Sequence, residues 1–117
     1  MAFYRKLSFL EALRWDAPDG TLSIAHMKLE AAILELFAYK NATDEPASRA
    51  RVAGNLDEVG VKHIALSVPS LETAYSELEA AGIPIATEMQ EGRTGIRFFF
   101  VRDPDGLWVE IVEDKRF

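Results

Sequence analysis

The sequence contains no cysteine, has a deficit of basic residues and has no long apolar run. Without cysteine the chain forms no disulfide and binds no metal through thiolates. Its 13 Lys and Arg residues are outnumbered by 19 Asp and Glu residues, which gives a formal net charge of −6. This balance argues against binding to nucleic acid or to anionic membranes through a basic surface.

The sequence also shows no apolar segment of the kind that directs a chain to a membrane. No apolar run approaches the ~20 residues that a membrane-spanning helix needs. The segment Met1–Lys6 lacks the apolar centre of a signal peptide, so we expect a cytoplasmic protein. With 117 residues, 49% of them hydrophobic, the chain can bury a core as one domain or as two half-size modules.

The segment VKHIALSV, residues 61–68, has the alternation of a strand with two different faces. Its apolar face is expected to pack on the core: Ile64, Leu66 and Val68. Its smaller and more polar face is typical of a cleft lining: His63, Ala65 and Ser67. Taken alone, His63 is better explained by hydrogen bonding on a half-open sheet than by metal ligation, and it is the rest of the chain that reverses this preference.

The pattern after this strand predicts one helix followed by three strands. The helix, Leu71–Ala81, has a serine cap immediately before it and a glycine immediately after it. The strands expected next are Ile83–Glu88, Ile96–Val101 and Leu107–Glu113. Residues Asp103–Gly106 have turn chemistry at every position. Alternation in the last strand places Glu110 on the same face as Trp108 and Val112.

The first half of the chain predicts the end of a helix over Ala2–Leu7 and strands over Phe9–Trp15 and Leu22–Leu29. His26 is interpreted as an ordinary strand residue, because no carboxylate stands at a spacing that would engage it. The run Ala31–Lys40 fits either a helix or a strand.

In the strand interpretation of residues 31–40, Glu35 shares a face with Ile33, Phe37 and Tyr39. A carboxylate on such a face would be nearly buried, which is costly unless it is paired or bound to a metal.

The two halves resemble each other, which indicates an internal duplication. We expect a first module over residues 1–40, a polar linker over 41–60 and a second module over 61–117. Each half ends on a glutamate between apolar residues, Glu35 and Glu110. His63 precedes Glu110 by 47 positions, and 47 positions before Glu35 falls about a dozen residues before Met1. The first module is therefore expected to lack its first strand.

Four stretches together resemble the vicinal oxygen chelate superfamily (glyoxalase/bleomycin resistance/extradiol dioxygenase), most closely its glyoxalase I branch. They are Phe3–Leu7, Leu34–Phe37, Lys62–Val68 and Phe100–Gly106 with the following Val109–Ile111. The resemblance implies an α+β fold of paired βαβββ modules that form a curled mixed-sheet cup. Ser8 departs from the family pattern, which commonly has glycine there.

The resemblance also implies a metal site. Glu35, His63 and Glu110 match three of the family's ligand positions, and the fourth has no match in this chain. Imidazole and carboxylate donors suit Ni, Zn, Fe, Mn or Co. Such a divalent ion would bind a small oxygenated substrate through two oxygens, in lyase, isomerase or dioxygenase chemistry, with Glu110 or Glu35 as the base.

Two alternatives stay open at this stage. One is a metal-free protein that binds small molecules, as the antibiotic-binding members do, in a pocket with aromatic walls. The candidate walls are Phe37, Tyr39, Phe98, Phe100 and Trp108. The other is a truncated, non-catalytic remnant of the fold. Whichever of these functions the protein has, the sheet edge left by the missing strand predicts a homodimer.

Overall fold

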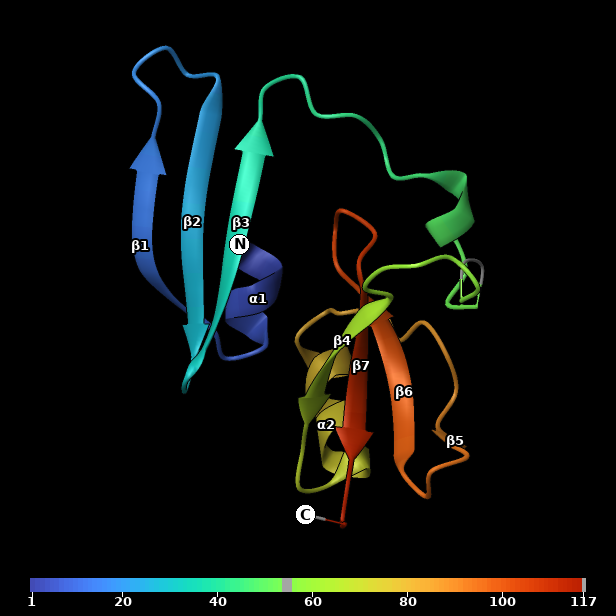
Figure 1. Cartoon of the computed structure of the whole chain (residues 1–117). Helices are drawn as coiled ribbons and strands as arrows, with labels where there is room; N and C mark the ends of the chain where they lie inside the picture. Colours follow the sequence, from blue (N-terminus) through green and yellow to red (C-terminus); the bar gives the residue numbers. More distant parts are fainter. Residues whose placement is uncertain (54–55, 117) are drawn as a thin grey trace. The chain divides into compact units, whose positions relative to one another are not determined.

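The computed structural model describes residues 1–53 and 56–116 and divides the chain into two compact units, Met1–Asp44 and Glu45–Phe117 (Figure 1). Gly54 and Asn55 of the expected linker and Phe117 of the expected second module lie outside the described residues. Each unit combines an α-helix with its own β-sheet. The α+β class expected from the sequence is therefore confirmed.

Unit 1 consists of α1 (Ala2–Lys6), β1 (Leu10–Asp16), β2 (Leu22–Leu29) and β3 (Ala32–Tyr39), and its antiparallel sheet has the order β1-β2-β3. The segment that fitted either a helix or a strand is a strand. Leu29 pairs with Ala32, so only two residues connect β2 to β3. The first of these, Glu30, has a φ of 52°, and such left-handed conformations suit two-residue hairpins.

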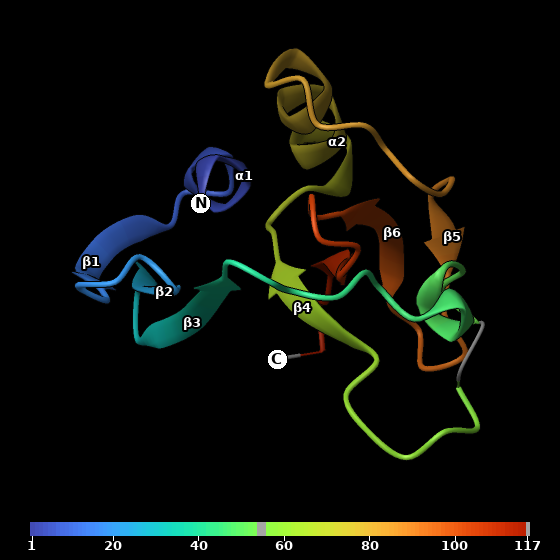
Figure 2. The same ribbon diagram turned by 90° about the horizontal axis from the view of Figure 1, so that it is seen from above.

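The helix α1 lies against one face of the unit 1 sheet (Figure 2). The buried side chains of this unit are Phe3, Tyr4, Phe9, Ala25 and Met27. Tyr4 makes edge-on ring contacts with both neighbouring phenylalanines. Because Ala25 and Met27 alternate with His26 along β2, His26 lies on the opposite face of the sheet.

Unit 2 contains β4 (His63–Ser67), α2 (Leu71–Ala80), β5 (Gln90–Glu91), β6 (Arg97–Arg102) and β7 (Trp108–Glu113), preceded by the short 3₁₀ helix Ala47–Arg49. The sheet order is β4-β7-β6-β5, with β4 parallel to β7 and the other pairs antiparallel. This is the βαβββ order expected for the second module, and unit 1 has the same order from its helix onward.

The strand expected over Ile83–Glu88 is wrong. Ile85 makes only an isolated bridge with Val101, and the short strand β5 comes later. The backbone N–H of Ala86 donates to the carbonyl of Phe100, but the N–H of Phe100 donates to the hydroxyl of Thr87 at 2.9 Å. A side chain thus takes the place of a backbone acceptor, so the regular ladder does not form.

The helix α2 covers one face of the unit 2 sheet (Figure 2). Its buried residues occur at helical spacing: Leu71, Ala74 and Leu78. Opposite them in the sheet are Phe99, Val101, Val109 and Ile111. The expected serine cap is confirmed, since Ser70 Oγ accepts from the backbone N–H of Thr73 at 3.3 Å.

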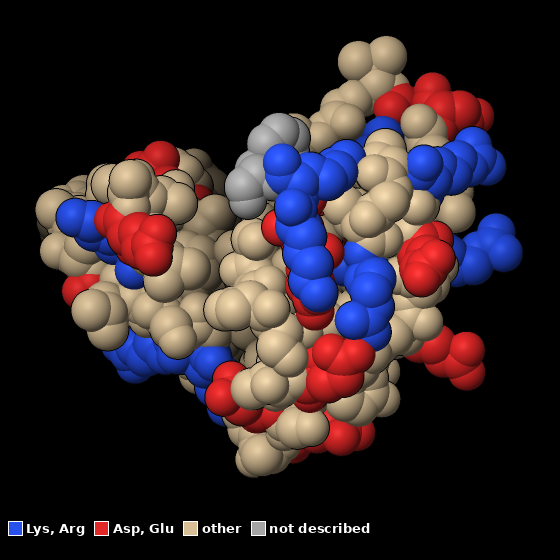
Figure 3. Space-filling model, turned by 90° about the horizontal axis from the view of Figure 1, so that it is seen from below, with Lys and Arg blue, Asp and Glu red and all other residues tan. Residues whose placement is uncertain are grey.

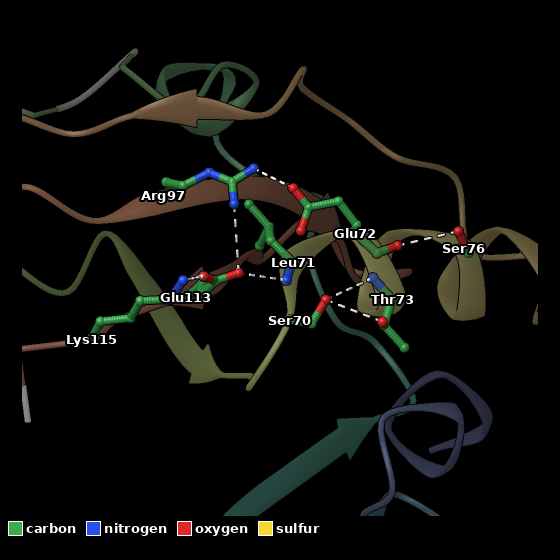
Figure 4. A network of polar contacts seen from close by, with 8 residues as sticks. All are labelled: Ser70, Leu71, Glu72, Thr73, Ser76, Arg97, Glu113 and Lys115. Carbon is green, nitrogen blue, oxygen red and sulfur yellow. Dashed lines mark hydrogen bonds and ion pairs between the residues drawn. The ribbon is translucent and has the colours of Figure 1, made fainter.

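A second acceptor at the start of α2 comes from the last strand (Figure 4). Glu113 accepts a hydrogen bond from the backbone N–H of Leu71 at 2.9 Å and pairs with Lys115 at 2.6 Å. The Lys115 ammonium and the Leu71 N–H lower the pKa of Glu113. Arg97 lies 3.6 Å from the same carboxylate and also pairs with Glu72, so the helix start is tied to β6 as well.

Charged side chains of both signs are interspersed on one face of the molecule. On the face drawn in Figure 3, Lys and Arg side chains lie beside Asp and Glu side chains. Among the described residues, no helix has both the length and the apolar character that crossing a bilayer requires.

Candidate functional site

The two buried glutamates of β7 lie on opposite faces of the strand and have different partners. Glu113 contacts α2 and basic side chains, as described above. Glu110 is 9% exposed, and its ion-pair partner is His63, with 3.2 Å between His63 Nε2 and Glu110 Oε2. No Lys or Arg among the described residues pairs with Glu110. A buried carboxylate with only an imidazole beside it is costly unless a cation completes its surroundings.

The parallel pairing of β4 and β7 brings these two residues together. His63 is aligned with Trp108 and Ala65 with Glu110, so the imidazole and the carboxylate are diagonal neighbours. They lie on the face of the sheet away from α2. The alternation of residues 61–68 predicted this face for His63, and the structure confirms it, with Ile64 and Leu66 on the other side.

The other ring nitrogen of His63 has no partner. His63 Nδ1 is buried without a hydrogen bond, and among the side chains that the structure describes it is the one nitrogen or oxygen in this condition. Leaving such an atom unsatisfied costs about 1–3 kcal/mol. The imidazole is therefore held by Glu110 and by ring packing rather than by a second polar contact.

Aromatic side chains lie on one side of the His63–Glu110 pair, with Phe100 in contact with His63. The ring of Phe100 meets the His63 ring edge-on at 5.2 Å between centroids, and it also contacts Phe98 at 5.7 Å and Trp108 at 6.1 Å. The three unit 2 aromatics in the predicted pocket wall thus form one cluster beside the imidazole. Their role in binding a substrate stays a prediction.

Arg102 positions the edge of this cluster, and the sequence interpretation did not single it out. Its guanidinium carbon lies 4.6 Å from the centre of the Trp108 ring, and it forms an ion pair with Glu45. The indole N–H of Trp108 donates to the backbone carbonyl of Arg49 at 2.9 Å. The sequence did contain one signal for this contact. Arg102 directly precedes the DPDG turn, and residues on either side of a tight turn pair across the two strands, as Arg102 does with Trp108.

Unit 1 carries a second histidine–glutamate pair, which corrects two sequence-based expectations. His26 is aligned with Glu35 across β2 and β3, with 3.0 Å between His26 Nε2 and Glu35 Oε1. The interpretation of His26 as a residue without a carboxylate partner is therefore wrong. The expectation that Glu35 is nearly buried is also wrong, since its side chain is 50% exposed.

The remaining predicted wall residues lie in the same unit. Phe37 and Tyr39 share the Glu35 face, as the alternation predicted, and their rings stack with 6.5 Å between centroids. Both are more than half exposed. They lie on the sheet face opposite α1, together with the His26–Glu35 pair.

The spacing within each pair suits a divalent ion. Two donors about 2.1 Å from one ion, at octahedral or tetrahedral angles, are about 3.0–3.4 Å apart. The two nitrogen–oxygen distances, 3.2 Å and 3.0 Å, fall in this range. The described residues offer donors in pairs, and no group of three or more His, Asp or Glu side chains is gathered among them. Convergence of Glu35 with His63 and Glu110 stays a prediction.

Comparison with known sequences matches nearly the whole chain. The profile of the Glyoxalase/Bleomycin resistance protein/Dioxygenase superfamily matches residues 1–111. The chain is 36% identical over 87 residues to a lactoylglutathione lyase from Pseudomonas putida, which covers 74% of this chain and 49% of that protein. It is 30% identical over 124 residues to a lactoylglutathione lyase from Schizosaccharomyces pombe, which covers 98% of this chain and 40% of that protein. The chain thus spans half or less of these relatives.

Solved structures support the same fold. A glyoxalase family protein from Enterococcus faecalis is 26% identical, with a TM-score of 0.79, and the alignment covers 96% of this chain and 84% of that one. Glyoxalase I from Zea mays aligns with a TM-score of 0.70 over 97% of this chain and 38% of that one, at 16% identity. The second likeness concerns the fold alone.

Proposed function

Because the chain belongs to the glyoxalase/bleomycin resistance protein/dioxygenase superfamily, we propose that it is a metal-dependent, glyoxalase-like enzyme. Its substrate is a small molecule with two neighbouring oxygen atoms, and its metal ligands include Glu35, His63 and Glu110. The observation that carries this proposal is the His63–Glu110 pair, in which a buried carboxylate lies 3.2 Å from an imidazole with no basic side chain beside it.

The donor set determines the kind of ion and the chemistry. One imidazole and two carboxylates suit Ni, Zn, Fe, Mn or Co. Such an ion, when bound, supplies Lewis acidity at the substrate oxygens.

Proton transfer at the carbon next to these oxygens needs a base from the chain itself. Glu110 and Glu35 are the candidates. The cluster of Phe98, Phe100 and Trp108 beside His63 would exclude water from one side of the reacting group.

Metal content and metal affinity test this proposal directly. The protein is purified without chelators, its metal content is measured, and Co²⁺ binding is followed by calorimetry for the wild type and for Glu110→Ala. We expect the wild type to bind Co²⁺ and the variant to lose at least about tenfold in affinity. Glu79→Ala, on the exposed surface of α2, is the matched control and should bind as the wild type does.

Two results would overturn the proposal. One is a wild-type protein that binds none of the five ions. The other is equal Co²⁺ affinity in the wild type and Glu110→Ala, because the ion would then be bound elsewhere. A thermal melt of each variant without metal confirms that any loss of binding does not come from unfolding.

A metal-free binding protein of the antibiotic-binding type is the second candidate. It is favoured by the aromatic cluster around Phe100, because aromatic faces bind flat or cationic ligands without a metal. In that case a bleomycin-type antibiotic should raise the melting temperature in the presence of EDTA. Substitution of Trp108 by alanine should abolish the rise, whereas the metal-dependent alternative predicts no rise in EDTA.

A further inference from the structure

The His63 imidazole is oriented largely by ring packing, since one of its two nitrogens makes no hydrogen bond. Its Nδ1 atom is buried and unsatisfied, and its Nε2 atom lies 3.2 Å from Glu110 Oε2. The last torsion of a histidine side chain has broad minima, so the chain itself restricts the ring only loosely. Histidines that bind metals are usually fixed by a hydrogen bond from the second ring nitrogen. In this protein, the side chains packed on the ring have to supply that restraint.

Phe100 is the aromatic residue that contacts the imidazole, edge-on, with 5.2 Å between the ring centroids. Its side chain is 4% exposed, so its own position depends on the residues around it. One of these is Trp108, whose ring meets that of Phe100 at 6.1 Å and an interplanar angle of 84°. Edge-to-face contacts favour particular orientations of the two rings. A displacement of Trp108 would therefore displace Phe100 and, through it, the imidazole of His63.

Trp108 is held in place by Arg102 and by the backbone of Arg49. Its indole N–H donates to the Arg49 carbonyl at 2.9 Å, and a guanidinium N–H of Arg102 donates to the same carbonyl at 3.2 Å. Arg49 is the last residue of the short 3₁₀ helix Ala47–Arg49, where a carbonyl has no partner within the helix. One backbone oxygen thus fixes the indole and the guanidinium relative to each other, with the guanidinium carbon 4.6 Å from the ring centre.

The guanidinium of Arg102 donates to two further acceptors. Its Nε–H donates to the carbonyl of Gly106 at 3.2 Å, and a terminal N–H donates to the carboxylate of Glu45. Gly106 has a φ of 92°, and a Cβ at this position would overlap the Glu45 carboxylate. A planar guanidinium with several fixed acceptors has one preferred orientation. The missing side chain at Gly106 therefore leaves room for the carboxylate that holds Arg102 over Trp108.

We propose that Arg102 is a positioning residue of the His63 site. It holds Trp108 against Phe100 and thereby fixes the imidazole with Nε2 toward Glu110. All of these residues belong to unit 2. The effect on metal affinity rests on the proposed function, whereas the effect on the imidazole does not depend on a metal. An arginine with a merely structural role would stabilise the turn between β6 and β7 and leave the His63 ring unchanged.

The orientation of the imidazole is measured without metal. In EDTA, two-dimensional NMR of the full chain shows the ring signals of its two histidines, and His26→Gln identifies those of His63. In the wild type we expect nuclear Overhauser contacts between the rings of His63 and Phe100. In Arg102→Ala these contacts should weaken, and the His63 signals should move toward those of free histidine, because the ring current of Phe100 no longer acts from one position. The His26 signals should stay unchanged.

Conservative and control variants separate positioning from stability. Arg102→Lys keeps a cation near Trp108 and should restore part of the ring contacts. Glu113→Gln is expected to lower the stability of unit 2 from the other face of β7, and it should leave the His63 signals in place. Arg93→Ala, in an exposed loop, should do the same. Calorimetry with Co²⁺ should show at least about a tenfold loss of affinity in Arg102→Ala and the wild-type affinity in the two controls.

The outcomes separate this inference from the proposed function. A wild type that binds Co²⁺, with unchanged His63 contacts in Arg102→Ala, overturns the role of Arg102 and leaves the proposed function intact, whether or not the variant loses affinity. Displaced contacts with unchanged affinity overturn it as well, and so does an equal displacement in Glu113→Gln. A wild type without metal affinity overturns the proposed function, and the spectra in EDTA then still decide whether Arg102 orients His63.

Discussion

Glu113, in the last strand, accepts a hydrogen bond from the backbone N–H of Leu71, the first residue of α2, at 2.9 Å. The two residues are 42 positions apart in the sequence. The bond satisfies one of the N–H groups that a helix leaves without a partner in its first turn, and it places a negative charge at the positive end of the helix. This contact therefore makes the start of α2 dependent on the end of β7.

Replacement of Glu113 should lower the stability of unit 2 in two steps. Glu113→Gln keeps an acceptor for the Leu71 N–H but loses the charge that pairs with Lys115 and Arg97. Glu113→Ala loses both. We expect the melting temperature to fall in the order wild type, Gln, Ala, as measured by circular dichroism. Equal melting temperatures for the two variants would contradict the capping role.

The pH dependence of the same contact has a definite sign. The pKa of Glu113 is lowered in the folded protein, so its contribution is fully present above the unfolded pKa of about 4.5 and is lost as the pH falls through the folded pKa. The difference in stability between the wild type and Glu113→Gln should therefore shrink as the pH is lowered below about 4.5. Urea unfolding at pH 7 and at pH 3 measures it, and a difference that grows toward acid would have the wrong sign.

The backbone at Ser8 predicts a stabilising substitution. Ser8 has a φ of 68°, a left-handed conformation that costs residues other than glycine about 1 kcal/mol. Relief of this strain in Ser8→Gly should raise the free energy of unfolding by about 0.5–1 kcal/mol. The greater conformational entropy that glycine gives to the unfolded chain offsets part of this gain. Chemical denaturation measures the change. Ser23→Gly, in β2, is the opposite control: it places glycine in a strand and removes the hydroxyl that donates to Asp16, and should destabilise the protein.

Metal binding should be visible in stability. If Co²⁺ binds the folded chain at His63 and Glu110, then Co²⁺ at 100 times its Kd should raise the free energy of unfolding by about 2.7 kcal/mol. At the same Co²⁺ concentration the rise should fall to about 1.4 kcal/mol or less in Glu110→Ala, as a tenfold or larger loss of affinity requires, and persist in full in Glu79→Ala. A rise of equal size in Glu110→Ala would mean that the ion stabilises the protein from another place.

The contact of Arg102 with the Trp108 ring predicts a measurable packing energy. Arg102→Ala removes a cation–π contact at 4.6 Å and the ion pair with Glu45, and should cost about 1 kcal/mol. Arg102→Lys should recover part of this, because a lysine keeps the charge. Urea denaturation followed by tryptophan fluorescence measures both. Arg93→Ala, in an exposed loop, should have no effect on the unfolding midpoint.

The exposed edge of the unit 1 sheet leads us to expect that the protein associates with itself. Its strand order is β1-β2-β3, so β3 forms an edge, and Ile33 on this edge is 57% exposed. Edge strands with apolar side chains pair readily with another chain, and we expect a homodimer in sedimentation velocity. A charge on the edge, as in Ile33→Lys, should shift the protein toward monomer. A wild type that is monomeric at tens of micromolar would contradict this prediction.

The fold was predictable where one local pattern determines an element. The alternation of apolar residues placed the strand Leu22–Leu29 at its observed ends, and the cap and the apolar spacing placed α2 within one residue. The face of His63 also followed from alternation. These features depend only on side chains within a few positions of one another.

The parts that were missed depend on contacts between distant positions. His26 and Glu35 are nine residues apart, and they become partners only because a two-residue turn at Glu30 fixes the hairpin register. The expected strand Ile83–Glu88 failed because the hydroxyl of Thr87 replaces a backbone acceptor. Neither propensity nor periodicity contains such information.

The two glutamates of β7 limit which sequence changes the protein can tolerate in this strand. Glu110 and Glu113 are three positions apart and lie on opposite faces, the first beside an imidazole and the second at a helix start. A one-residue insertion or deletion before β7 would invert the strand and bring each carboxylate to the wrong side. Evolution and protein engineers are thus limited to substitutions in this strand, since any shift of its frame removes the partner of His63 and the anchor of α2 together.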